Sequence, residues 1–324
     1  MSINLEVFDI YTVIVLGAGA SAHLDYPLGS TLCDKILKNT EDPSAVSFTQ
    51  LREMGFSQNL ISDFHEKFAA SGASSIDDFL QKRREFIEVG RAAIAWELIK
   101  YEDLVKIRER RNNWYCRLRD QIRQQIDEND PHGLVLVTFN YDRSVDKFLH
   151  DFFTSIYPER AKSESVEHRV PILHVHGRLG YLEHQTDCGP CRPYKPTASP
   201  EEILISSKSI QIPVELEGKP LGAEMIDARD AITSKKTRQV IFLGFGYDST
   251  NLRRLEIYHP ITGWIADKSY LGTAYNLPRS MIEKLSQVSQ GKLILGDQNT
   301  PIYQFLNNQN CWSSTVDPIN RRFP

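Results

Sequence analysis

The sequence predicts an α/β protein whose core is a doubly wound parallel sheet. Short runs of apolar and β-branched residues recur along the chain and alternate with segments of helical periodicity. The first run, residues 12–16 (TVIVL), does not alternate with charged residues, which is typical of a strand buried on both faces. A glycine-rich turn follows this strand at once, as it does in Rossmann-like sheets.

Length, charge and cysteine content exclude several classes of protein. A chain of 324 residues can bury a sizeable core in one large or two modest domains. The net charge of -4 does not predict binding to nucleic acid or to a membrane, and no apolar run approaches the roughly 18 residues of a membrane span. The first residues lack the features of a signal peptide, and five scattered cysteines indicate a reducing compartment. We therefore expect a cytoplasmic location.

The turn after the first strand is a candidate phosphate-binding loop. Residues 17–22 (GAGASA) fit the pattern G-x-G-x-x-G/A, in which glycines let backbone N–H groups approach a phosphate. An ordinary tight strand-to-helix turn is the alternative. A dehydrogenase would place a second strand before an acidic residue that holds the ribose. Glu41 and Asp42 lie at about that distance, but the preceding residues 30–38 look helical.

The sequence pattern from residue 45 to residue 127 predicts helices and no strands. We expect an all-helical insertion at 45–127, between two parts of one catalytic domain, 1–44 and 128–324. Ser75 resembles a helix-capping residue, and apolar residues at helical spacing follow it to residue 98. A second such pattern covers residues 104–126, so two long helices are expected to pack as a hairpin. This segment should either cover the substrate site or form a subunit interface.

Beyond the insertion the alternation of strands and helices resumes. Strands are predicted at residues 134–138, 170–175 and 239–243, with weaker ones at 270–275 and 292–295. A helix is predicted over residues 223–235. Residues 178–215 are rich in proline and are expected to be irregular.

Polar residues follow the predicted strands where parallel sheets bind their ligands, at the carboxyl ends. Asn140 and Asp142 follow the second strand, and His176 follows the third. An asparagine there can hold a hydroxyl or a water, and a histidine can accept a proton from a sugar hydroxyl. Each also has a structural explanation, since Asp142 precedes a helix and His176 could be a buried imidazole, as we expect His174 to be. The loop after the fourth strand adds Gly244, Gly246 and Asn251.

Four motifs follow one another in the chain: GAGAS, residues 138–142 (TFNYD), His176-Gly177 and the later glycine-rich turn. In this order they resemble the sirtuin superfamily, over roughly residues 12–251. The resemblance implies an NAD site in which Asn140 orients the nicotinamide ribose or a water, and His176 acts on a ribose hydroxyl. It also implies that Asp142 supports the nicotinamide end of NAD. The other expected NAD-binding residues are Gly17, Ala18, Gly19, Ser21, Gly244, Gly246 and Asn251.

The cysteines depart from the pattern of sirtuin deacylases, which carry a zinc module with two CxxC pairs. This chain has one close pair, Cys188 and Cys191, with His184 nearby, whereas Cys33, Cys116 and Cys311 lie far away in the sequence. We therefore expect no metal. Without a zinc module, water is a simpler acceptor for the ribose of NAD than the acyl-lysine that deacylases use. In this respect, and in its long helical insertion, the chain is more similar to the bacterial sirtuin-like NAD hydrolases of anti-phage defence.

The expected function is hydrolysis of NAD to nicotinamide and ADP-ribose. One alternative is an NAD-dependent protein deacylase, and another is a non-catalytic subunit that senses NAD or ADP-ribose for a partner. Because uncontrolled loss of NAD is toxic, we expect control through a homo-oligomer or through a separate activating protein such as an ATPase.

Overall fold

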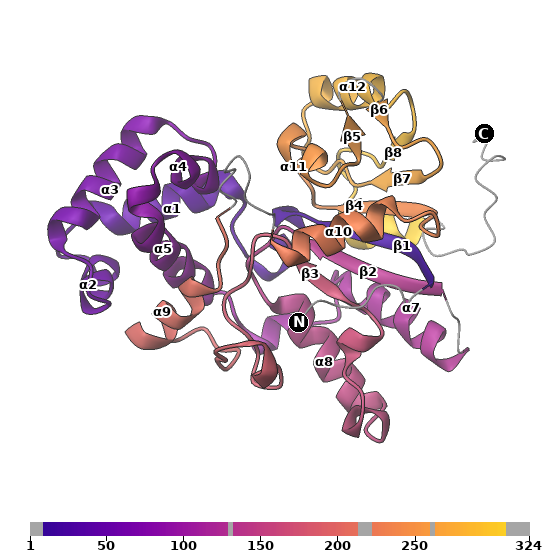
Figure 1. Ribbon diagram of the computed structural model, residues 1–324, viewed down its shortest axis with the longest axis horizontal. Coiled ribbons are helices and arrows are strands. Elements are labelled where there is room, and N and C mark those ends of the chain that lie inside the picture. Colours follow the sequence, from indigo (N-terminus) through magenta and orange to yellow (C-terminus); the bar gives the residue numbers. More distant parts are fainter. Residues whose placement is uncertain (1–8, 129–131, 213–221, 260–262, 309–324) are drawn as a thin grey trace.

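The central sheet of the computed structural model has six strands, all parallel, in the order β3-β2-β1-β4-β7-β8 (Figure 1). The structure describes residues 9–128, 132–212, 222–259 and 263–308. Strands β2 and β3 lie on one side of β1, and the later strands β4, β7 and β8 lie on the other side. The predicted doubly wound architecture is therefore confirmed. The strands are β1 (Asp9–Leu16), β2 (His132–Thr138), β3 (Ile172–His174), β4 (Gln239–Leu243), β7 (Ser269–Gly272) and β8 (Leu293–Leu295). A small antiparallel pair, β5 (Tyr258–His259) and β6 (Gly263–Trp264), lies apart from it.

Side chains of β1 alternate between two hydrophobic cores, one on each face of the sheet. Val13 and Val15 belong to one core, and Ile14 and Leu16 belong to the other. The first core is covered by α10 (Ala223–Thr233), α11 (Ser249–Arg254) and α12 (Arg279–Val288). On the opposite face lie α7 (Tyr115–Asp127), α8 (Ser144–Ile156) and α13 (Ile302–Asn308) (Figure 1). Burial on both faces explains the unbroken apolar run of this strand.

The predicted strands at 134–138 and 239–243 are confirmed, and those at 170–175 and 270–275 are shorter than predicted. Two long helices are not found in the helical segment, and that prediction is wrong. The first pattern divides into α4 (Ile76–Lys82) and α5 (Ile87–Ile99), because Arg83 leaves the helical region at φ -120° and ψ 70°. The second divides into α6 (Leu104–Arg108) and α7.

The break between α6 and α7 has a local cause at Asn113. Its amide nitrogen donates to the carbonyl oxygens of Ile107 and Glu109, while its Oδ1 accepts the backbone N–H of Tyr115. The side chain thereby replaces the backbone hydrogen bonds that a continuous helix would make.

Helices from different parts of the sequence form what we term the helical body, on the left of Figure 1. It comprises α1 (Gly29–Glu41), α2 (Val46–Glu53), α3 (Gln58–Ser71), α4, α5 and α9 (Pro200–Lys208). The α9 helix lies in the segment that was expected to be irregular, and it packs along α5. A capping box formed by Ser199 and Glu202 begins it. Because α7 packs against α8 under the sheet, the helical body does not coincide with residues 45–127, and the domain boundaries stay a prediction.

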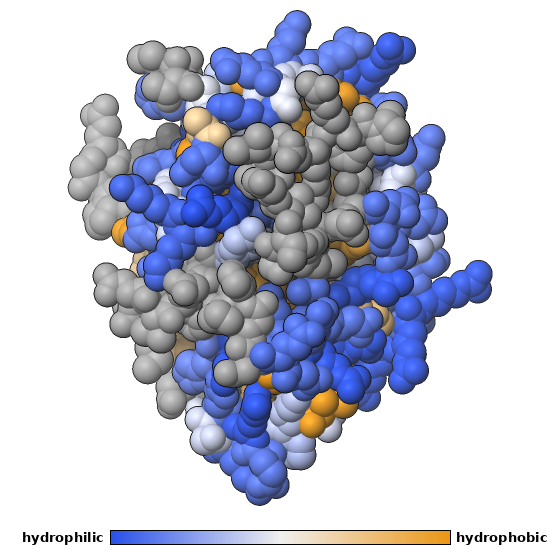
Figure 2. Space-filling view, turned by 90° about the vertical axis from the view of Figure 1, so that its right-hand side faces the viewer, coloured by the Kyte–Doolittle hydropathy of each residue, from blue (hydrophilic) through white to orange (hydrophobic). Residues whose placement is uncertain are grey.

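No helix among the described residues is both long enough and apolar enough to cross a membrane. In the view of Figure 2, the described part of the surface is mainly hydrophilic, with small and separate hydrophobic spots.

Candidate functional site

The register of the sheet brings the candidate residues to one edge. The last paired residues of four adjacent strands lie side by side, namely His174, Thr138, Leu16 and Leu243. His176, Asn140 and Ala18 each lie two positions beyond the last residue of their strand. They are therefore neighbours at the carboxyl edge. The strand order reverses between β1 and β4, which is where open α/β sheets bind ligands.

The glycine-rich turn packs backbone to backbone against the loop after β4. The N–H of Gly17 donates to Leu243 O at 3.1 Å, and the N–H of Gly19 donates to Gly244 O at 2.9 Å. A Cβ on Gly17 would lie 2.6 Å from Gly244 O, and Gly244 itself has φ +58°. Contact between the two loops thus requires glycine at these positions. The N–H groups of Gly17 and Gly19 therefore already have acceptors within the protein. Ala18 and Gly246, in contrast, are exposed.

The substitution Gly17→Ala should lower the free energy of unfolding by about 1–3 kcal/mol, because the added methyl group overpacks the contact with Gly244. Gly246→Ala is a matched control, since a Cβ there meets no atom within 4 Å. Urea denaturation of both variants checks the prediction. Equal stability of the two variants would contradict the proposed packing role.

Asn140 is held by its amide nitrogen, which donates to Gly17 O at 2.9 Å and to Ser21 Oγ at 3.1 Å. The carbonyl acceptor at Gly17 fixes the orientation of the amide. No described residue donates to Asn140 Oδ1, so this oxygen can accept a hydrogen bond from a ligand. The structure thus connects the glycine turn to the loop after β2.

Asp142 has both carboxylate oxygens engaged by the protein. Ser21 Oγ donates to Oδ2 at 2.6 Å, and the backbone N–H and hydroxyl of Ser144 donate to Oδ1. Asp142 therefore helps to fix the start of α8, in which Arg143 is the N-cap residue and Ser144 is the first helical residue. Asp142 also orients Ser21, which in turn contacts Asn140.

His176 is 6% exposed and lies between two aromatic rings. Its ring centroid is 5.1 Å from that of Phe139 and 6.3 Å from that of Tyr141. The Nε2 atom is buried and has no hydrogen-bond partner among the described residues. Burial, with the charge of Arg254 as a second cause, lowers the pKa of His176 to about 3. The imidazole is therefore neutral at physiological pH.

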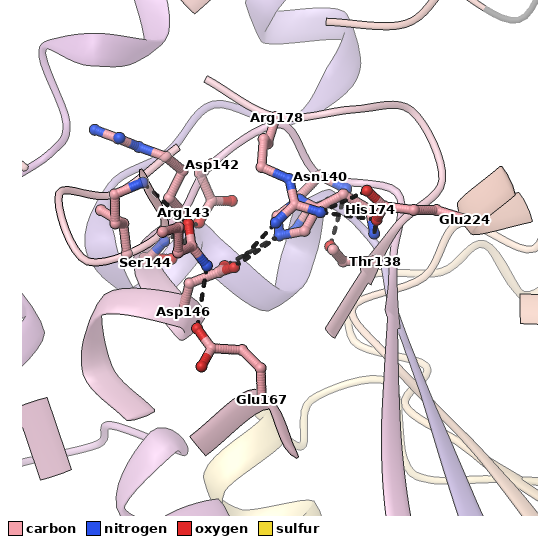
Figure 3. A network of polar contacts seen from close by, with 12 residues as sticks. Thr138, Asn140, Asp142, Arg143, Ser144, Asp146, Glu167, His174, Arg178 and Glu224 are labelled. Carbon is pink, nitrogen blue, oxygen red and sulfur yellow. Dashed lines mark hydrogen bonds and ion pairs between the residues drawn. The ribbon is translucent and has the colours of Figure 1, made fainter. Parts of the chain in front are cut away.

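A buried ion-pair network anchors the end of β3 just before His176 (Figure 3). His174 Nε2 lies 3.1 Å from Asp146 Oδ2, and Arg178 bridges Asp146 and Glu224, with 2.6 Å between its Nη2 and Glu224 Oε1. Burial raises the pKa of Asp146, but His174 and Arg178 outweigh it and lower this pKa to about 2. His174 is buried, as expected, and its Nδ1 has no hydrogen-bond partner among the described residues. The partners Asp146, Arg178 and Glu224 were not predicted.

A second buried network ties three segments together around Glu102. Arg143 donates to both oxygens of this carboxylate, at 3.0 and 2.8 Å, and Arg192 donates to Oε2. All three side chains are at most 1% exposed. Arg143 also donates to the carbonyl oxygens of Tyr181 and Arg192. The network fixes the loop between β2 and α8, on which Asn140 and Asp142 lie.

The loop after β4 is ordered by short-range contacts. Gly244 N–H donates to Thr273 Oγ1 at 2.8 Å, and Asp248 caps α11 through the backbone N–H groups of Thr250 and Asn251. Asn251 Oδ1 accepts a hydrogen bond of 3.4 Å from Arg254. Asn251 thus lies in the first turn of α11, and the last residue of that helix, Arg254, is its hydrogen-bond donor.

The close cysteine pair lies in the loop that precedes α9. Cys188 is exposed, Cys191 is half-buried, and both are free thiols. His184 is engaged elsewhere, because its Nε2 lies 3.1 Å from Glu167 Oε1 and its ring stacks on His150. Within the described parts of the chain, no group of three or more ligating side chains could hold a metal. Cys311 lies outside the described residues.

The sequence matches no protein-family model, and no curated protein matches it significantly. A buried neutral imidazole and an amide oxygen that no described residue donates to follow two adjacent strands at the carboxyl edge of the sheet, and each offers a hydrogen-bond acceptor there.

Proposed function

We propose that this protein is an NAD hydrolase of sirtuin-like type, which cleaves the nicotinamide–ribose bond to give nicotinamide and ADP-ribose. The observation that carries the proposal is the buried Nε2 of His176, which has no hydrogen-bond partner among the described residues and follows β3, the strand beside the one that leads to Asn140. Buried polar atoms normally have partners, and an exception at the carboxyl edge of a parallel sheet supports a ligand-binding role for this histidine.

The chemistry of bond cleavage suits these two residues. Loss of nicotinamide from the ribose passes through an oxocarbenium-like transition state, as in glycoside hydrolysis. Asn140 Oδ1 would accept a hydrogen bond from the attacking water and so position it. Neutral His176 would accept a hydrogen bond from a ribose hydroxyl and raise the electron density on the sugar. The low pKa of His176 disfavours complete transfer of that proton. Nicotinamide leaves as a neutral molecule and needs little acid assistance.

The remaining NAD-binding residues extend from this centre along the sheet edge. Ala18 and Gly246 are exposed on the two loops that meet there, and Gly17, Gly19, Ser21, Gly244 and Asn251 support them. We propose that the reaction takes place in the cytoplasm and depletes NAD in antiviral defence. Control would come from a homo-oligomer or from a separate activating partner, for which an ATPase is one candidate.

The test is incubation of the purified protein with NAD, with and without an acyl-lysine peptide, and chromatography of the products. Nicotinamide and ADP-ribose should form at equal rates in both samples and in the presence of a metal chelator. Turnover that depends on the peptide would favour the deacylase alternative. Tight binding of NAD without turnover would favour the sensing subunit.

The neutral state of His176 predicts a pH dependence of stability. Its pKa is about 3 in the folded protein and near 6.5 in the unfolded chain, so its contribution to stability is complete above pH 6.5. As the pH falls from 6.5 toward 3, the free energy of unfolding should decrease by about 1.4 kcal/mol per pH unit from this group. His176→Gln should remove this part of the slope in urea denaturation between pH 4 and 6. Parallel slopes for the two proteins would contradict burial of the imidazole in its neutral form.

A further inference from the structure

Two cysteines that the proposed function does not use lie close together in the loop before α9. Cys188 and Cys191 are separated only by Gly189 and Pro190. Two intervening residues are the spacing of the dithiol motifs that form and break disulfides in redox proteins. Both cysteines are free thiols in this structure, with Cys188 exposed and Cys191 half-buried. The pair therefore combines one thiol that a reagent can reach with one that is partly covered by the protein.

The sulfur of Cys191 lies on the side of its partner. Cys191 Sγ donates to Gly189 O at 3.2 Å, so this side chain points back along the chain toward Cys188. Burial raises the pKa of the Cys191 thiol, and the charge of the Cys188 sulfur is the second cause. Because a thiolate is the nucleophile in disulfide exchange, Cys191 is the poorer first attacker of the two.

The chain around Cys191 is anchored by the fold. The N–H of Tyr181 donates to Pro190 O at 3.2 Å, and the N–H of Arg192 donates to Tyr181 O at 2.9 Å. Arg143 also donates to the carbonyl oxygens of Tyr181 and Arg192, at 2.8 and 3.0 Å. Cys191 thus lies between two residues that are both bonded to Tyr181, and it offers a fixed second sulfur.

The loop also rests on the ring of Tyr181. A Cβ on Gly189 would lie 2.8 Å from Tyr181 Cε2, so the lack of a side chain at Gly189 lets the loop approach the ring. The Cζ of Arg178 lies 5.0 Å from the centroid of the same ring. Arg178 belongs to the ion-pair network at the end of β3. A change in the bonding of the cysteines would therefore act first on Tyr181 and through it on this network.

We infer that Cys188 and Cys191 form a reversible disulfide by exchange with a low-molecular-weight disulfide such as oxidised glutathione. The Cys188 thiolate attacks one sulfur of oxidised glutathione, forms a mixed disulfide and releases one glutathione thiolate. Cys191 then loses its proton to solvent, and its sulfur attacks Cys188 Sγ and releases the second glutathione. The protein dithiol loses two electrons and two protons, and one oxidised glutathione is reduced to two glutathione molecules. In reducing compartments such disulfides are usually transient and serve redox sensing or catalysis.

The test is equilibration of the reduced full chain with mixtures of reduced and oxidised glutathione, followed by alkylation of free thiols and mass spectrometry of peptides. In wild type, Cys188 and Cys191 should lose alkylation together as the oxidised share rises, and their peptide should lose two hydrogens. Cys191→Ser should stop at the mixed disulfide, with one glutathione on Cys188. Cys188→Ser should react at Cys191 at least about tenfold more slowly than wild type reacts at Cys188.

Cys116→Ser is the matched control, because Cys116 is a half-buried free thiol on α7, away from this loop in the sequence. It should form the disulfide like wild type, and melting temperatures verify that each variant folds. Two free thiols in wild type, at a glutathione ratio that modifies Cys188 in Cys191→Ser, would overturn the inference. So would zinc held by the reduced pair and lost in Cys188→Ser, since the pair would then be a metal site.

These outcomes are independent of the proposed function, because no reading depends on NAD. A disulfide in a protein that cannot cleave NAD supports this inference and contradicts the hydrolase. Cleavage of NAD by a protein that forms no disulfide overturns this inference and leaves the hydrolase intact.

Discussion

Replacing His176 or Asn140 by alanine should lower the rate of NAD cleavage at least about 100-fold, because each variant loses an acceptor that we place at the ribose or at the attacking water. Neither residue supports the core in a way that would prevent folding. Asn140 is half-buried, and the buried Nε2 of His176 has no hydrogen-bond partner within the described parts of the chain. The measurement is the initial rate of nicotinamide release at saturating NAD, together with a thermal melt.

His168→Ala is the matched control for His176, since His168 is exposed and lies before β3 rather than after it. It should retain the wild-type rate. The Asn140 and His176 variants should also have a lower kcat and not only a higher KM, because both groups are expected to act most strongly in the transition state. Near-wild-type turnover by a folded Asn140→Ala or His176→Ala variant would remove that residue from the mechanism.

The largest loss of stability should come from Glu102→Ala. This change leaves Arg143 and Arg192 buried without their shared carboxylate, and breaking a buried ion pair in this way typically costs about 3–5 kcal/mol. Urea denaturation measures the change in the free energy of unfolding. The substitution should also reduce NAD cleavage, because Arg143 lies in the same loop as Asn140.

Glu283→Ala provides the comparison, since it removes an exposed ion pair with Arg279 on α12. Its cost should stay below about 0.5 kcal/mol. A cost below about 1 kcal/mol for Glu102→Ala would contradict a structural role for the buried network.

Local sequence signals were sufficient for the sheet and for the strand ends. Residues 12–16 and 239–243 carry the apolar pattern of fully buried strands, and parallel pairing then brings their carboxyl ends together. For this reason, the proximity of Asn140 and His176 could be predicted without knowing the packing of any helix. The sequence also contains the capping box at Ser199, which could have revealed α9.

Features that depend on packing between distant segments could not be predicted in this way. Glu102 lies 41 residues from Arg143 and 90 residues from Arg192, and no local pattern joins them. The hydrogen bond of 3.4 Å from Arg254 on α11 to Gln81 on α4 likewise depends on how α4 packs in the helical body. The role of the glycine turn could not be predicted for a different reason. The same glycine pattern allows close approach to a phosphate and close packing against the Gly244 loop.

The most direct test of the central claim is proton NMR of NAD mixed with a stoichiometric amount of the purified protein. The spectrum distinguishes cleavage at the nicotinamide–ribose bond from cleavage at the diphosphate. Our account predicts that the nicotinamide ring signals move to those of free nicotinamide, while ADP-ribose appears in equal amount. The appearance of nicotinamide mononucleotide and AMP in place of nicotinamide and ADP-ribose would contradict it.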